Sequence, residues 1–450
     1  MSARLWVSHR QVDEHEIARP VLTRSTRRAL LTLDVRASAM AREVRAGAHE
    51  PNDRTRRARR DPRHREESIQ GATFRGPPTE ERRTDMAQEP VVWDADPHTK
   101  AKHDLYRRYL DRWMPIMIRG AWKGDVTYAE GFSGPGVYAD GSPGSPLIAF
   151  DTIRQDESLR ARSVKKNVRM LFVEQRSDRC DRLREELAKR SHPLALDALP
   201  EKAGITVEIR QGSYDPTLVA LLDEHRCWGK PILAVLDSWG GGVNIDLVQR
   251  IAKNPSSEVL ITLQPQFFSR FADAPERKHG DAVFGHSRWR DVAKQPSHRK
   301  TRWLIERYRD TIHGAGFTHV LDFELVDHRG ASLYLVFGTA HDKGLQKMKE
   351  AMWEVDPGYG SGYRDPRDPN QQTLLIEDRP QTHALRRLIR AHLEAQPARS
   401  ATVHEICDFA FRKTIFKTAQ ASSVVKEMAE QGDVIRVRHP QRNLDVITLR

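Results

Sequence analysis

The sequence predicts an α/β fold with a mostly parallel sheet, because short apolar runs alternate with amphipathic helical patterns from Val126 onward. Two later apolar runs, His319–Val326 and Ser332–Thr339, are separated by a turn too short for a helical crossover. These two runs should therefore pair as an antiparallel hairpin. The earlier strand candidates are Val168–Glu174, Thr206–Arg210, Ile232–Asp237 and Glu258–Leu263, and the helix candidates between them are Ser177–Lys189, Pro216–His225 and Asn244–Ala252.

Parallel strands that end in an antiparallel pair are the layout of the Rossmann-like class I methyltransferase fold. The domain predicted in this way covers residues 86–354, and the glycine- and proline-rich composition of residues 355–380 predicts a linker. Within the domain, the polar and basic stretch Ala274–Arg309 contains Trp289 and Trp303. For these two tryptophans we favour packing in the core over base stacking.

A glycine-rich loop follows the first strand, and the apolar run after it predicts a helix. Strand, glycine loop and helix together let a nucleotide-like ligand approach the backbone at a helix N-terminus. Glu130 directly precedes the loop, where it suits a cationic ligand such as S-adenosylmethionine and would repel a pyrophosphate. The dinucleotide pattern is only partly met, because Ala139 occupies its third glycine position. A tight turn without a ligand is the alternative. The cofactor-binding candidates here are Glu130, Gly131, Phe132, Gly134 and Gly136.

Three further candidates stand at or after the ends of later strands. Glu174 ends the second strand, where an acid commonly holds ribose hydroxyls, and its alternative role is an exposed strand-end acid. Ser213 follows the third strand and could flank an adenine. Asp237 ends the fourth strand, at the edge where open α/β sheets place ligands, and its alternative role is a helix cap.

The first helix of the folded part is predicted from His98 to Trp113, with Thr99 as its cap. Lys100, Lys102 and His103 cluster in its first turn, where the helix macrodipole disfavours cations. This unfavourable placement indicates either a role near an anion or the active site, or simple exposure to solvent.

Residues 1–85 differ in composition from the rest of the chain, because they are rich in arginine, contain no lysine and have few apolar residues. Such a segment is predicted to be disordered, with Met86 as a possible true start and a basic nucleic-acid-binding arm as the alternative. The formal charge of +12 favours a polyanionic partner. Three widely spaced cysteines predict no metal site and a cytoplasmic location, and no apolar run is long enough to cross a membrane.

Residues 381–450 predict a winged helix-turn-helix domain, with helices His383–Ala395, Val403–Phe411 and Ala419–Gln431 followed by two strands around a basic turn. The third helix and the wing of such a domain can contact nucleic acid, although many winged helices bind protein instead. The nucleic-acid-binding candidates are Lys413, Lys417, Lys426, Arg436, Arg438 and Arg442.

Several motifs in the chain match one known family. They are His98-Thr-x-Ala-Lys-His103, Tyr109-Leu-x-x-Trp-x-Pro-Ile116, Gly131-Phe-Ser-Gly-Pro-Gly-x-Tyr138, Gly144-Ser-Pro-Leu-Ile148, Tyr334-Leu-Val-Phe-x-Thr339 and Lys343-Gly-Leu-Gln-Lys-Met-Lys-x-x-Met-Trp353. From about Trp93 onward the chain resembles the three-Cys-motif partner proteins (TcmP). The resemblance implies a three-Cys-motif protein of the phage type as the partner. The glycine loop is more distantly similar to that of ribosomal RNA adenine-N6 methyltransferases.

One motif departs from this family, which usually has Asp-Pro-Phe-Gly where this chain has Asp237-Ser-Trp-Gly. In adenine methyltransferases the carboxylate accepts hydrogen bonds from the target amine and the aromatic ring stacks on the base. Asp237 and Trp239 keep these two groups as catalytic candidates, whereas Ser238 replaces the rigid proline. The resemblance therefore implies an S-adenosylmethionine-dependent methyltransferase acting on nucleic acid. The alternative is a catalytically inactive nucleic-acid-binding accessory protein, which Ser238 and the Gly240–Gly242 run favour.

Overall fold

The computed structural model describes residues 90–120, 125–164, 166–272, 278–365, 367, 380–396, 398–438 and 444–450. The predicted disordered extension at residues 1–85 and the nucleic-acid-binding candidate Arg442 lie outside this range. All of the described residues belong to one compact unit of the chain. None of the helices in these residues is both long and apolar enough to cross a membrane.

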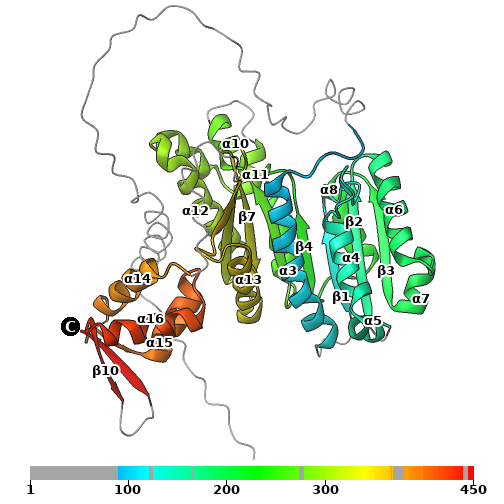
Figure 1. Ribbon diagram of the computed structural model, residues 1–450. Coiled ribbons are helices and arrows are strands. Elements are labelled where there is room, and N and C mark those ends of the chain that lie inside the picture. The colour runs from blue at the N-terminus through cyan, green and yellow to red at the C-terminus, as the bar shows by residue number, and fades with distance from the viewer. Residues whose placement is uncertain are drawn as a thin grey trace, which may run out of the picture. The chain divides into compact units, whose positions relative to one another are not determined.

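The centre of the protein is an eight-stranded sheet with the order β3-β2-β1-β4-β5-β7-β6-β8. Strand β7 runs antiparallel to both of its neighbours, and every other neighbouring pair is parallel (Figure 1). The predicted mostly parallel sheet and its antiparallel hairpin are thus confirmed. The strands are β1 (Asp125–Glu130), β2 (Asn167–Glu174), β3 (Ile205–Gln211), β4 (Ile232–Leu236), β5 (Glu258–Leu263), β6 (His319–Val326), β7 (Ser332–Thr339) and β8 (Gly362–Arg364).

The strands send alternate side chains into two hydrophobic cores, one on each face of the sheet. In β4, for example, Leu233 and Val235 face one core while Ala234 faces the other. The first core is covered by α3 (Pro97–Arg119), α4 (Ser145–Gln155), α5 (Glu157–Ser163), α6 (Ser177–Ser191), α7 (Leu199–Ala203) and α13 (Asp342–Val355). The second is covered by α8 (Tyr214–Glu224), α9 (Ile245–Ala252), α10 (Pro265–Phe271), α11 (Lys278–Phe284) and α12 (Ser297–Ala315).

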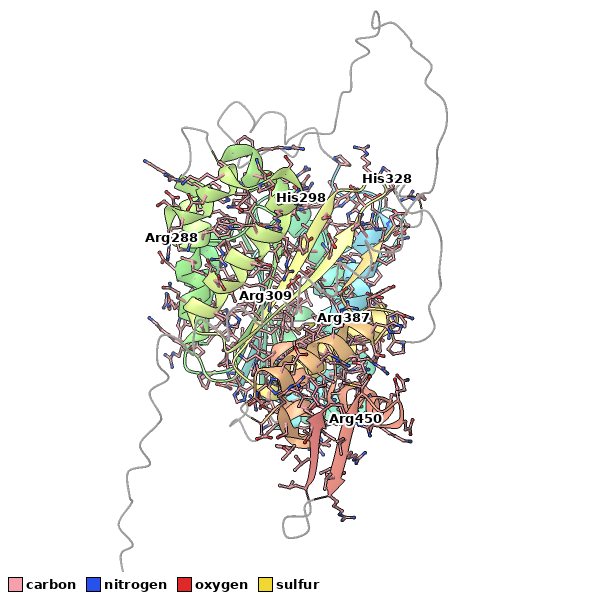
Figure 2. All side chains as sticks on the ribbon, turned by 90° about the vertical axis from the view of Figure 1, so that its left-hand side faces the viewer. Arg288, His298, Arg309, His328, Arg387 and Arg450 are labelled. Carbon is pink, nitrogen blue, oxygen red and sulfur yellow. The ribbon has the colours of Figure 1, made fainter. Side chains whose placement is uncertain are left out.

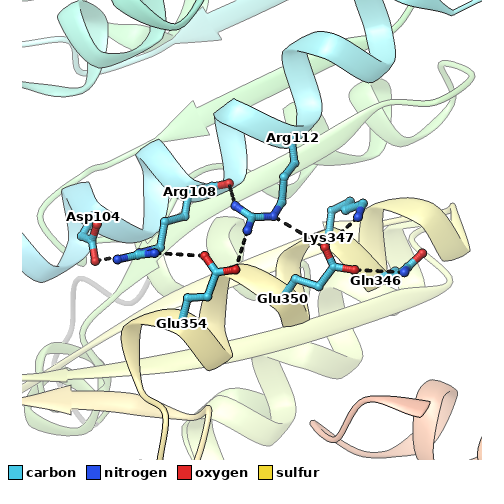
Figure 3. A network of polar contacts seen from close by, with 7 residues as sticks. All are labelled: Asp104, Arg108, Arg112, Gln346, Lys347, Glu350 and Glu354. Carbon is cyan, nitrogen blue, oxygen red and sulfur yellow. Dashed lines mark hydrogen bonds and ion pairs between the residues drawn. The ribbon is translucent and has the colours of Figure 1, made fainter. Parts of the chain in front are cut away.

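Helix α3 is longer than predicted at both ends, because it begins at Pro97 and continues through Pro115. Asp96, rather than Thr99, occupies the N-cap position, because Pro97 after it is well suited to the first position of the helix. Its apolar face, which carries Leu105, Tyr109, Leu110 and Trp113, is buried. On its other side, Arg108 and Arg112 pair with Glu350 and Glu354 of α13 (Figure 3). This network joins two helices that are far apart in the sequence.

The basic stretch after β5 forms α11, the 3-10 segment η3 (Ser287–Lys294) and α12. Trp289 is buried and Trp303 packs against the same core, as predicted. Arg288 and His298 lie at the surface of this stretch (Figure 2). Strand β8, which pairs with β6, falls inside the segment predicted as a linker.

The C-terminal part contains the three predicted helices, α14 (His383–Glu394), α15 (Val403–Lys413) and α16 (Thr418–Glu430). A capping box between Thr402 and Glu405 fixes the start of α15. The predicted hairpin is formed by β10 (Val434–Arg438) and β11 (Asp445–Leu449), and a short strand, β9 (Ser400–Thr402), adds to it.

Candidate functional site

The candidate site lies at the carboxyl edge of the sheet, between β1 and β4. The chain proceeds from β1 to β2 and β3 on one side, and from β4 to β5 on the other. The loops that leave β1 and β4 therefore diverge at this point, which is the place where open α/β sheets commonly bind ligands. Glu130 at the end of β1 pairs in register with Val235, two residues before Asp237. The sheet thus brings Glu130 and Asp237 to the same edge.

The glycine loop is packed closely on the sheet and on α6. Gly134 and Gly136 have φ angles of 61° and 76°, in the left-handed region that favours glycine. A Cβ atom on Gly136 would lie 2.6 Å from the Leu183 side chain. The Ser133 amide donates to the carbonyl oxygen of Val173 at 3.0 Å, which fastens the loop to β2. Backbone conformation therefore favours glycine at both positions, and at Gly136 a side chain would also lack space.

Glu174 holds the glycine loop through its carboxylate. One oxygen accepts a hydrogen bond from the Gly134 amide at 3.0 Å, and the other accepts from the Arg176 amide at 2.9 Å. The Glu174 carbonyl oxygen also accepts from the Gly212 amide at 2.9 Å, which brings the neighbouring Ser213 to this edge. Ser213 is exposed, and its hydroxyl donates to the Asp215 carbonyl oxygen at 2.6 Å. Glu174, Gly134 and Ser213 thus belong to one cluster.

Asp237 forms an ion pair with Lys102 of α3, whose side chain is 10% exposed while that of Asp237 is 15% exposed. Burial would raise the pKa of Asp237, but the Lys102 ammonium and the Thr262 hydroxyl more than offset it, so the pKa lies below its usual value. Of the two roles predicted for the cationic first turn of α3, the role near an anion is confirmed for Lys102. Lys100 instead pairs with the exposed Asp140 at 2.7 Å.

Glu130 is buried, with 1% of its surface exposed. Its carboxylate accepts hydrogen bonds from the Tyr128 hydroxyl at 2.5 Å and from the Ser145 hydroxyl at 2.8 Å. Burial raises its pKa to about 8. Glu130 therefore connects β1 to the first turn of α4, and near neutral pH it presents no exposed negative charge to a ligand.

Two side chains of α3, the Tyr106 phenol and the His103 imidazole, complete the candidate site. Of these two, Tyr106 was not predicted from the sequence. The Tyr106 hydroxyl is buried and has no hydrogen-bond partner among the described residues. Burial and the negative charges of Asp237 and Glu130 raise the pKa of Tyr106 well above 10. Burial and the Lys102 charge lower the pKa of His103 to about 3, so its ring is neutral. Tyr106 follows Lys102 by one helical turn, which is the signal that could have identified it.

The loop after β4 exposes Trp239 and is held in place by contacts of the two glycines that follow it. Trp239 is 58% exposed and has a φ angle of 55°. The Gly240 amide donates to the Thr262 hydroxyl oxygen at 3.2 Å, and the His279 ring lies 2.6 Å from the Gly241 carbonyl oxygen. The Ser238 hydroxyl has no partner among the described residues. Asp237 and Trp239 therefore stand together, one nearly buried and one exposed.

The basic candidates of the C-terminal part are at least partly accessible, but several already interact with the protein. Arg436 pairs with Asp445 across the hairpin at 2.8 Å. Lys426 lies 3.8 Å from Glu430, and the Lys417 ammonium lies 5.9 Å from the centre of the Trp353 ring. Lys413 and Arg438 are exposed as well.

The buried Glu130 predicts a measurable pH dependence of stability. Its pKa is about 8 in the folded protein and about 4.5 in the unfolded chain, so the folded state binds more protons between these values. The free energy of unfolding should therefore fall as pH rises through this window, by on the order of a few kcal/mol from this group. We expect Glu130→Gln to remove this part of the fall, as measured by urea denaturation from about pH 5 to about pH 8. Glu201→Gln, at an exposed site, serves as the control. Equal pH slopes for wild type and Glu130→Gln would contradict the prediction.

Comparison with known proteins adds no family assignment, since the chain has no significant match to any protein-family model or curated protein. Within the described residues, no group of three or more histidine, cysteine, aspartate or glutamate side chains could hold a metal ion.

Proposed function

We propose that the protein is a class I, S-adenosylmethionine-dependent methyltransferase-like protein of the three-Cys-motif partner family, acting on nucleic acid with a three-Cys-motif protein. The observation that carries this proposal is the sheet order, with a single antiparallel strand, β7, between β5 and β6. This order supports the class I methyltransferase fold over other Rossmann-like folds. It also brings the loops after β1, β2 and β4 to one edge, where such a protein needs its ligand sites.

The residues at this edge fit an adenosyl cofactor in part. Gly134 carries no side chain that would keep a ligand from the loop, and its amide is bonded to the Glu174 carboxylate, whereas Gly136 packs against Leu183 and would only shape the loop. Ser213 would contribute from the same edge. Glu130 does not fit the role of a carboxylate that faces the cation, because it is buried and bonded to Tyr128 and Ser145. Glu130 would instead position the loop.

When bound, S-adenosylmethionine supplies an electrophilic methyl group. The Asp237 carboxylate would accept hydrogen bonds from the amine that receives it, and Trp239 would stack on the base. For this to happen, Lys102 must yield at least one lone pair of Asp237 to the substrate, because the two side chains are paired. The buried Tyr106 hydroxyl, whose pKa the Asp237 charge helps to raise, has no hydrogen-bond partner among the described residues and so has a hydrogen bond to offer.

The second candidate function is an inactive nucleic-acid-binding accessory protein, and the Lys102–Asp237 pair favours it. A carboxylate that already has a counter-ion is a weaker acceptor for a substrate amine. In either case the C-terminal part would contribute to nucleic-acid binding. Its three helices and β10–β11 hairpin support the winged helix-turn-helix proposal, with Arg436 and Arg438 on β10.

Calorimetric titration with S-adenosylhomocysteine tests the cofactor proposal. We expect saturable binding by the full chain and a roughly 10- to 100-fold weaker affinity for Glu174→Gln, which removes a charged acceptor while keeping its shape. Glu201→Gln should bind like wild type. Absence of binding by the folded wild-type protein would remove the methyltransferase proposal and leave the accessory function.

A further inference from the structure

Trp93, which precedes α3, lies directly on the glycine loop. The Ala139 amide donates to the Trp93 carbonyl oxygen at 3.0 Å. A Cβ atom built on Gly134 would lie 3.6 Å from the Trp93 ring, and the Tyr138 ring meets that indole edge-on at 5.8 Å between centroids. The Arg179 guanidinium lies 4.6 Å from the centre of the same indole. The Trp93 side chain is thus fixed by contacts with the loop and with α6.

The ring of Trp93 also meets that of Trp239, with the two centroids 5.6 Å apart and the planes inclined by 50°. The two loops of the candidate site are thereby bridged by a pair of indoles. Trp93 is half-buried and held by its neighbours, whereas Trp239 exposes more than half of its surface. One ring of the pair is fixed, and the other offers a large apolar face to solvent beside the Asp237 carboxylate.

The conformation of Trp239 is costly for a residue whose side chain remains exposed. A φ angle of 55° is unfavourable for a bulky side chain. Exposing an indole also forgoes the free energy that its burial would provide. Strain of this kind is found at functional sites, where a ligand rather than the core determines the conformation. These two features point to a flat apolar ligand on Trp239.

We infer that Trp93 and Trp239 form a stacking platform for unpaired nucleobases, so that the protein binds single-stranded rather than duplex nucleic acid. Bases in single strands offer their faces to aromatic side chains, whereas bases in a duplex are already stacked on each other. The inference rests on the proposed function, since it names the form of the nucleic acid that this site takes. The platform stands next to Asp237, so a base stacked on it would present its exocyclic groups near that carboxylate.

Fluorescence anisotropy with labelled oligonucleotides of about 12 nucleotides tests the inference on the full-length protein. The probes are single-stranded RNA, single-stranded DNA and the corresponding duplexes, each measured over a series of salt concentrations. We expect single strands to bind more tightly than duplexes. Trp239→Ala and Trp93→Ala should each weaken single-strand binding by roughly 5- to 150-fold, without changing the salt slope, because stacking involves no phosphate. Trp239→Phe should retain most of the affinity.

Trp228→Ala is the control for loss of an indole outside the candidate site, because Trp228 is half-buried on the second core and lies under Arg250, with 4.0 Å from the guanidinium to the ring centre. It should bind like wild type. Since Trp93 contributes to packing, Trp239→Ala, whose side chain is exposed, is the decisive variant. Duplex binding as tight as single-strand binding, no binding of either, or an unchanged affinity of Trp239→Ala would overturn the inference. Single-strand binding without S-adenosylhomocysteine binding would instead remove the methyltransferase proposal and keep the platform. S-adenosylhomocysteine binding without single-strand binding would overturn the platform alone.

Discussion

Replacing Lys102 with methionine is expected to lower the free energy of unfolding by about 3–5 kcal/mol. The substitution keeps an apolar side chain of similar length but leaves the Asp237 carboxylate without its counter-ion. Asp237 is nearly buried, and the Thr262 hydroxyl alone does not compensate a buried charge. The loss is therefore expected to come mainly from the carboxylate that remains, and only secondarily from the lost attraction.

Urea denaturation of three variants at neutral pH separates these contributions. Lys100→Met is the matched control on the same helical turn, because Lys100 and Asp140 are 55% and 39% exposed, and we expect it to cost less than about 1 kcal/mol. The double variant Lys102→Met/Asp237→Asn should recover part of the stability, since it removes the uncompensated charge. A cost for Lys102→Met no larger than that for Lys100→Met would contradict the prediction.

The sign of the pH dependence should also reverse in this variant. With Lys102 present, the pKa of Asp237 is lowered, so the stabilisation that it provides is lost as pH falls through that lowered pKa. Without Lys102, burial is the largest remaining influence and raises the pKa of Asp237 above its unfolded value. The variant should then lose stability as pH rises through the acidic range, and this can be measured with the same denaturation series.

The sequence predicted the strands well wherever an apolar run had clear limits. The bounds of β5, β6 and β7 were predicted as they are observed, because polar or turn-forming residues flank each run. The helices of the basic stretch after β5 were not predicted, since charged residues dominate its composition and Trp289 is one of few apolar anchors. Strand β8 has only three residues, and no local pattern distinguishes so short a strand from a linker.

For the candidate site, the predicted ends of the strands indicated where the carboxylates lie, but not which groups they bond to. Glu130, Glu174 and Asp237 all lie at the carboxyl edge, as their places in the strand pattern indicated. Which partner each carboxylate has depends on tertiary contacts, such as that between Lys102 and Asp237, which are 135 residues apart. The burial of Glu130 could likewise not be predicted from the sequence, because an acid at a strand end can be either exposed to solvent or buried and hydrogen-bonded.

Lys349 of α13 provides the second large effect, through a buried ammonium group that has no carboxylate partner among the described residues. The side chain is 1% exposed, and its ammonium donates to the carbonyl oxygens of Phe416 at 2.9 Å, Ala410 at 3.3 Å and Phe411. Two of these carbonyls belong to the last turn of α15, where the helix dipole favours a cation. Nearby, the Trp353 indole donates to the Ile415 carbonyl oxygen at 2.9 Å. Lys349 thus anchors the end of α15 to α13.

Lys349→Met should therefore lower the free energy of unfolding by about 2–4 kcal/mol, because it leaves these carbonyls without a donor in a place with little access to water. Amide hydrogen exchange should show the loss first in residues 403–413, whose helix end is no longer held. Lys347→Met is the control on the same helix, since Lys347 pairs with the partly exposed Glu350, and we expect it to cost less than about 1 kcal/mol.

The pH profile of Lys349→Met provides an independent check of the same anchor. Burial lowers the pKa of Lys349 from 10.5 to about 7, so between these values the unfolded chain binds more protons than the folded protein. The contribution of this group to stability should accordingly rise with pH from about 7 to about 10, and Lys349→Met should lack this rise. Denaturation at several pH values in this range measures the difference, with Lys347→Met as reference. If both variants follow the wild-type slope, the Lys349 amine does not change its protonation on folding. Its burial between α13 and α15 would then not determine the stability of the protein.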